Sequence, residues 1–122
     1  MKHSLEVYRE DNLIFKSDRN WLHPLFELEE FLKNNKYTPE TLLVKDKIVG
    51  KAAVLILIYL NIGSIHAQIL SEVAKDTLEH FNIPFTYKEL VDRIKCKTED
   101  LLLNEFNPST AYKMLKERAQ KS

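Results

Sequence analysis

Residues 46–60 read DKIVGKAAVLILIYL, and the nine apolar residues at the end of this stretch decide how the rest of the chain must fold. A membrane-spanning helix needs about 20 apolar residues, and a Gly-Ser pair at Gly63 ends this run too early. A helix that is apolar on every side must be covered on every side. We therefore expect a buried helix from Lys51 to Leu60. A strand is the alternative, which the length of the run and its Ala-Ala start disfavour.

The Gly50-Lys51 pair before this helix resembles half of a phosphate-binding loop. A Walker loop needs another glycine five residues before the Gly-Lys pair and a hydroxyl-bearing residue directly after it, because backbone N–H groups wrap the phosphates and the hydroxyl binds magnesium. This chain has Lys45 and Ala52 at those positions. Both departures argue against a nucleotide-hydrolysing loop.

The composition predicts one domain, over residues 1–122, with no metal and no cofactor. Basic and acidic residues number 18 each, so the chain lacks the excess positive charge of a general nucleic-acid binder, and nucleic acid is not an expected partner. The lone Cys96 supplies neither a disulfide within the chain nor a cysteine-rich zinc site. The first residues lack the apolar stretch of a signal peptide. We expect a cytoplasmic protein that does not contact a membrane.

Strand and helix patterns alternate along the chain. The expected elements are strands at 5–11 and 12–18 joined at Asp11-Asn12, a helix over 21–35, a strand at 41–46, the buried helix, a strand at 64–70, a helix over 71–81, a short strand at 83–85, a short helix within 86–94 that starts with a Thr86–Glu89 capping box, and one or two helices in the tail, interrupted at Asn107-Pro108, the last of them over about 106–122. Such alternation predicts an α/β domain whose later strands are parallel.

Two junctions between a strand and a helix form the candidate binding site. They are Gly50-Lys51-Ala52 and Ser71-Glu72. If the two preceding strands are parallel neighbours, both helix N-termini lie at one edge of the sheet, where α/β sheets bind ligands and free N–H groups attract anions. The simpler interpretation is that Ser71 is a helix N-cap, Glu72 interacts with the helix dipole and Lys51 is a surface charge.

The stretch LLVKDKIVGKAAVLILIY, followed by IHAQILSEVAKDTLEHFNIPFTYKELV, resembles an uncharacterised bacterial family, the one called "domain of unknown function 1893". The resemblance spans roughly residues 5–105, and its most specific parts are V-G-K-A-A and S-E-x-A. That family belongs to the cytidine-deaminase-like superfamily. The resemblance implies a three-layer α/β/α sandwich with a mixed five-stranded sheet in the order 2-1-3-4-5.

The resemblance also permits a test for deaminase chemistry. Zinc deaminases carry H-x-E at the start of one helix and P-C-x-x-C at the start of the next. The two junctions here supply neither a metal ligand nor the catalytic acid, and His66-Ala67-Gln68 has Gln where the acid should be. The family's Cys-Pro-Met-Glu ending is also absent, apart from Glu105. The resemblance therefore implies a domain without the zinc site.

Three functions follow from these observations. The first is a non-catalytic deaminase-like domain that binds a small anionic ligand or a nucleotide at the two helix N-termini. The alternative is a structural or protein-interaction module that acts as a homo-oligomer through an apolar sheet edge and the amphipathic tail. The third is an enzyme that uses Glu72, Asp46 or Lys51.

Overall fold

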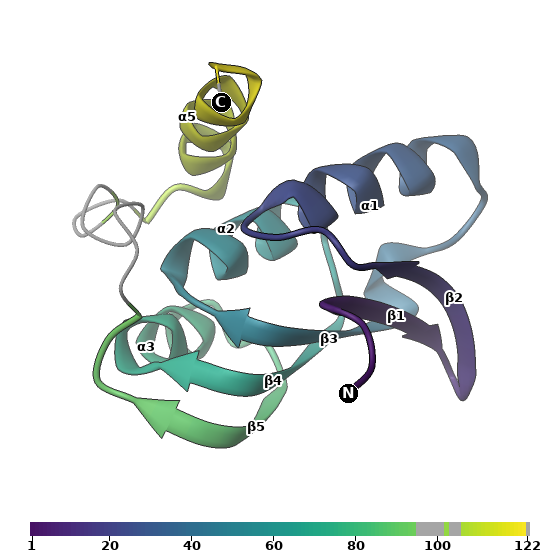
Figure 1. Ribbon diagram of the computed structural model, residues 1–122. Helices are drawn as coiled ribbons and strands as arrows, with labels where there is room; N and C mark the ends of the chain where they lie inside the picture. Colours follow the sequence, from purple (N-terminus) through teal and green to yellow (C-terminus); the bar gives the residue numbers. More distant parts are fainter. Residues whose placement is uncertain (95–101, 103–105, 122) are drawn as a thin grey trace.

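The computed structural model describes residues 1–94, 102 and 106–121, which form a mixed α/β fold (Figure 1). In chain order the elements are β1 (Leu5–Arg9), β2 (Asn12–Ser17), α1 (His23–Asn34), the short 3-10 helix η1 (Pro39–Thr41), β3 (Leu42–Val49), α2 (Lys51–Tyr59), β4 (Ser64–Ser71), α3 (Glu72–His80), β5 (Phe85–Val91) and α5 (Pro108–Lys121). The strands form one five-stranded sheet in the order β2-β1-β3-β4-β5. β1 is antiparallel to β2 and β3, whereas β3, β4 and β5 are parallel. The expected mixed sheet and its strand order are confirmed.

The nine-residue helix α2 is the centre of the core. Seven consecutive residues, Lys51–Leu57, are buried. The helix contacts β3, α1 and α3, and α5 packs against it as well (Figure 1). This arrangement explains why α2 has no polar side, because each of its sides meets another element. The predicted buried helix is confirmed.

The end of α2 differs in detail from the expectation that Gly63 stops the helix. Asn61 has a positive φ of 64°, and the N–H of Ile62 donates to the carbonyl of Leu57 at 3.1 Å. Asn61 is therefore the left-handed residue that ends the helix. Gly63 serves another purpose, because a Cβ at that position would lie 2.0 Å from the carbonyl oxygen of Glu40. The chain passes too close to η1 for any side chain there.

Residues 83–94 do not form the expected short strand and helix. Residues 85–91 of this stretch form β5 instead. This strand runs parallel to β4 from the pair Ile65 and Phe85 to the pair Ser71 and Val91. The capping-box pattern at Thr86 indicated a local preference for helix, but pairing with β4, a contact distant in sequence, determines the structure. A smaller correction concerns the first hairpin, whose turn is centred on Glu10-Asp11, one residue earlier than expected.

The described helices lie together on one side of the sheet, with α2 between α1 and α3 and with α5 packed on α2 (Figure 1). The other side carries a polar row in register across four strands, made of Glu6, Lys45, His66 and Thr86. His66 is half-buried there, and its Nδ1 lies 2.7 Å from Thr86 Oγ1. The residues that the structure describes therefore do not show the α/β/α sandwich that the resemblance implied.

The expected last helix of the tail is confirmed as α5. A buried carboxylate on α1 binds this helix through hydrogen bonds. Asn107 Oδ1 accepts from the N–H of Thr110 at its start. Glu29 of α1 is 5% exposed and accepts from Tyr112 Oη at 2.5 Å and from Lys116 Nζ at 2.9 Å. Burial alone would raise the pKa of Glu29, but these two hydrogen bonds hold it below its ordinary value. The tail helix expected before Asn107 lies outside the described residues.

Candidate functional site

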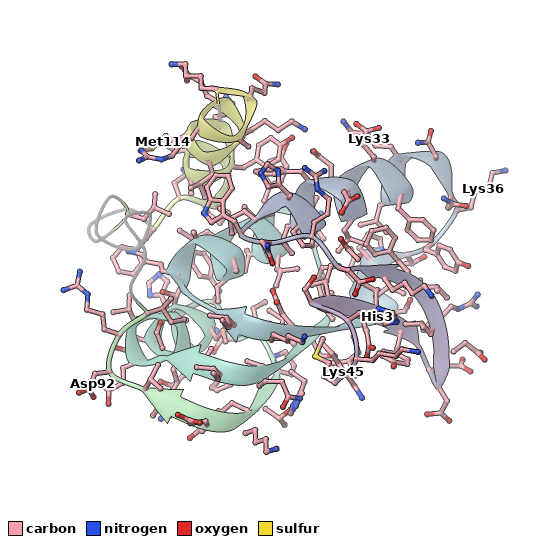
Figure 2. The ribbon with its side chains drawn as sticks, viewed as in Figure 1. His3, Lys33, Lys36, Lys45, Asp92 and Met114 are labelled. Carbon is pink, nitrogen blue, oxygen red and sulfur yellow. The ribbon has the colours of Figure 1, made fainter. Side chains whose placement is uncertain are left out.

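A cavity of about 270 Å³ lies at one edge of the sheet. It borders the C-terminal ends of β2 and β3, which run in the same direction on either side of β1. It also borders the start of β1. The residues that line it are Ser4, Arg19, Asn20, Trp21, Leu22, Pro24, Asp46, Lys47, Ile48, Gly50, Lys51, Ala52, Ala53 and Ile94. The C-terminal edge of parallel strands is where α/β proteins most often bind ligands. Figure 2 shows Lys33 and Lys36 at the opposite end of α1, so those two cations do not belong to this site.

The two junctions that the sequence singled out follow neighbouring strand ends, because β3 and β4 are parallel and Val49 pairs with Leu70, but they do not share the cavity. Gly50, Lys51 and Ala52 line the cavity, whereas Ser71 and Glu72 do not. Ser71 is completely buried, and Glu72 is exposed. The junction between β3 and α2 instead shares its cavity with the connection between β2 and α1.

The N-terminus of α2 faces this cavity without a side-chain cap from any described residue. Gly50 is the N-cap residue in an extended conformation, and its carbonyl accepts from the N–H of Val54 at 3.1 Å. The N–H groups of Ala52 and Ala53 belong to the first turn, where a helix offers no acceptor of its own. This end of the helix also carries the positive end of the dipole. The wall of the cavity at α2 is therefore suited to a negatively charged group.

Lys51 is not the surface charge that the simpler interpretation expected. Its side chain is completely buried. Its Nζ donates to the carbonyl oxygen of Leu102 and lies 4.1 Å from the centroid of the Phe106 ring. The cation thus fastens the start of α2 to the chain that precedes α5. Burial of an ammonium group requires such partners, because an uncompensated charge in the core costs several kcal/mol.

Asp46 is the titratable acid of the cavity. It projects from the helix-covered face of β3, and its register neighbours on either side are Leu5 and Ala67, which are both buried. This apolar setting raises the pKa of Asp46 to about 7, although hydrogen bonds from the backbone N–H groups of Ile48 and Lys47 oppose the shift. The carboxyl group therefore changes its charge near neutral pH.

Trp21 lies in the cavity wall in an unusual backbone conformation. Its φ is 59°, and 38% of its surface is exposed. A bulky residue at positive φ is strained by roughly 1–3 kcal/mol, and such strain is often found at functional sites. Sequence reasoning did not select Trp21, because it follows β2 and looks like part of the next helix. The expected strand order could have indicated Trp21, since it places the ends of β2 and β3 at one edge.

The described residues contain neither a metal-binding cluster nor a membrane-spanning helix. In residues 1–94, 102 and 106–121, no group of three His, Cys, Asp or Glu side chains is placed to hold a metal ion. Cys96 lies outside that part of the chain. Within the same part, every helix is too short or too polar to span a bilayer.

Comparison with known proteins identifies the family. The family model described as "Domain of unknown function (DUF1893)" matches residues 2–118. The chain belongs to this family. The crystal structure of a DUF1893 family protein from Thermotoga maritima is similar to the present DUF1893 chain, with a TM-score of 0.83 and 28% sequence identity over 94% of this chain and 80% of the other. No curated protein matches this chain. The family match includes all of the residues that line the cavity.

Proposed function

We propose that this DUF1893 chain is a non-catalytic domain that binds a small molecule in the cavity beside the N-terminus of α2. The observation that carries this proposal is a cavity of about 270 Å³ at the C-terminal edge of the sheet, bordered by a helix start that no described side chain caps. Ligand pockets typically enclose about 300–1,000 Å³, so this cavity suits a small metabolite or one part of a nucleotide.

An anionic group on the ligand is supported by the charges around the cavity. The first-turn N–H groups of Ala52 and Ala53 would donate to it, as helix N-termini commonly do for phosphate and carboxylate groups. Arg19 and Lys47 add two cationic side chains to the lining. The amine of Lys51 is completely buried and donates to the carbonyl of Leu102, so we do not assign it to the anionic group.

The proposed site includes one helix N-terminus, that of α2, in place of the two that the sequence indicated. Ser71 and Glu72 remain outside it, because the side chain of Ser71 caps α3. The strand order supports a relationship to the cytidine-deaminase-like superfamily, which remains part of the proposal, as does the three-layer arrangement. A cytoplasmic location also stays a prediction.

Thermal unfolding with a panel of probes tests the proposal. The panel is inorganic phosphate, benzoate and the four ribonucleoside monophosphates. A ligand at about 100 times its Kd should stabilise the fold by about 2.7 kcal/mol, which raises the Tm by roughly 10 °C. We expect a saturable rise in the Tm with at least one probe. The proposal is wrong if no probe raises the Tm.

A pair of variants locates the binding. Trp21 lines the cavity, whereas Tyr87 lies on β5 at almost the same exposure, 38% against 39%. Trp21→Ala should abolish the response to the probe, and Tyr87→Ala should retain it. Equal responses from the two variants would place the binding elsewhere.

Homo-oligomer formation is the second candidate function, and the edge strand β5 favours it. Residues 86–89 of β5 are exposed, and among the described strands β5 pairs with β4 only. An uncovered edge of this kind is able to pair with a strand of another copy. Light scattering across a range of concentrations tests this proposal. A monodisperse monomer at every concentration would contradict it.

A further inference from the structure

Among the described residues that line the cavity, Asp46 is the one titratable acid, and an anionic ligand alone gives it no role. The backbone N–H groups of Lys47 and Ile48 are its hydrogen-bond donors. Within the described part of the chain, no ion pair includes Asp46. Its carboxyl group thus lies in a mostly apolar cavity, and no described cation is paired with it.

This arrangement costs stability whenever Asp46 is ionised. Its pKa near 7 shows that the folded protein disfavours the ionised form. An asparagine would accept from the same N–H groups without carrying a charge. A costly carboxyl group in a cavity is a common property of functional sites. The carboxylate is therefore suited to a partner that comes from outside the chain.

The described cations that line the cavity are not paired with Asp46. Arg19 follows β2, Lys47 belongs to β3, and Lys51 begins α2. None of the three contributes to the pKa shift of Asp46, whose causes are burial and the two backbone N–H groups. The amine of Lys51 donates to the carbonyl of Leu102.

We propose that the ligand carries, besides its anionic group, a cationic nitrogen group such as an amine or amidine that donates hydrogen bonds to the carboxylate of Asp46. The ligand class is then a small zwitterion. A charge-assisted hydrogen bond is about twice as strong as a neutral one, and an apolar wall strengthens it further. This inference rests on the proposed function, because it assumes that the cavity is the binding site.

The test uses two probes of the same shape and opposite charge, benzamidine and benzoate, which both keep their charges between pH 6 and pH 8. Calorimetry should show that benzamidine binds the wild-type protein roughly ten times more tightly at pH 8 than at pH 6, because the fraction of ionised Asp46 rises by about that factor across its pKa. Asp46→Asn should weaken benzamidine binding at least tenfold at pH 8 and remove its pH dependence. The affinity for benzoate should not decrease in this variant.

The matched control is Glu72→Gln, which removes an exposed carboxylate at the other junction and should change neither affinity. A second readout is the ¹³C chemical shift of the Asp46 carboxyl, which should titrate at lower pH when benzamidine is bound. The inference is wrong if benzamidine does not bind while benzoate does, or if Asp46→Asn leaves the benzamidine affinity unchanged. In the first of these cases the proposed function survives. If neither benzoate nor any other probe of the panel binds, the proposed function fails and the inference fails with it.

Discussion

Two junctions between a parallel strand and a helix look equivalent in the sequence, yet they have different structures. At the start of α3, Ser71 Oγ accepts from the N–H of Ala74 at 3.1 Å, and the cap completes the helix locally. At the start of α2, Gly50 supplies no side chain, and the first turn borders a cavity. A helix start that is capped by its own sequence is complete, whereas an uncapped one leaves donors for a ligand.

The two junctions also differ in where their charges lie. Glu72 is exposed beside the positive end of the α3 dipole, where a carboxylate contributes only about 0.3–1 kcal/mol. Lys51 is buried and Asp46 lies in an apolar wall. The exposed charge at α3 therefore stabilises the helix without a desolvation penalty, whereas the charges at α2 carry such a penalty. The buried charge of Lys51 is held by its hydrogen bond to Leu102, so only the charge of Asp46 is better explained by binding than by stability.

Replacement of Lys51 should have the largest effect. Lys51→Ala removes a completely buried side chain together with its hydrogen bond to Leu102, and we expect a loss of about 3 kcal/mol in the free energy of unfolding, measured in urea. Lys51→Met keeps most of the packing and should lose less than half as much. Glu72→Ala is the control at the other junction and should lose less than about 1 kcal/mol. A loss below about 0.5 kcal/mol in Lys51→Ala would contradict the buried role of this side chain.

Asp46→Asn should stabilise the protein in a pH-dependent way. The pKa of Asp46 is about 7 in the folded protein and 3.8 in its unperturbed form. The folded state therefore keeps its proton to higher pH, and stability is lost as the pH rises from about 4 to 7. The asparagine variant avoids that loss, so we expect a gain of about 4 kcal/mol at pH 8 and less than half of it at pH 5. A gain of equal size at both pH values would show that ionisation is not its cause.

Ser71→Ala should have a smaller effect that is confined to α3. The loss of an N-cap hydroxyl costs about 1 kcal/mol, and Ser71, whose Oγ accepts from the N–H of Ala74, does not line the cavity. Urea unfolding should show this loss, while affinity for any probe that binds the cavity should stay unchanged. Ser71→Thr, which keeps the hydroxyl, is the control. A change in affinity without a change in stability would show that Ser71 takes part in binding and that the two junctions form one site.

The sequence predicted the core of the fold better than its edges. Nine consecutive apolar residues required a helix covered on every side, and α2 has that environment. The resemblance supplied the strand order. Residues 85–91 were wrongly predicted because the local signal at Thr86 and Glu89 indicated a helix, whereas pairing with β4 brings together residues about 20 positions apart. Local patterns do not report such pairing.

The candidate site was predicted in part. The cavity includes Gly50, Lys51 and Ala52, which the sequence selected from the position of a strand end. The burial of Lys51 was not predictable, because its acceptor at Leu102 is 51 positions away. Trp21 was missed because it looked like the first residue of the next helix, whereas it lies in the connection that follows β2 and lines the cavity.

The most direct test of the central claim is a fluorescence titration of Trp21, which is the only tryptophan in the chain and lies in the cavity wall. The titrants are the probes of the thermal panel, and the proteins are the wild type, Gly50→Ser and Glu72→Gln. Gly50 has an extended N-cap conformation that serine also adopts, so the new hydroxyl would cap α2 and change the stability by only a few tenths of a kcal/mol. We expect a saturable signal for the wild type and Glu72→Gln, and weaker binding for Gly50→Ser. No saturable signal from any probe, or equal affinities in all three proteins, would contradict the central claim.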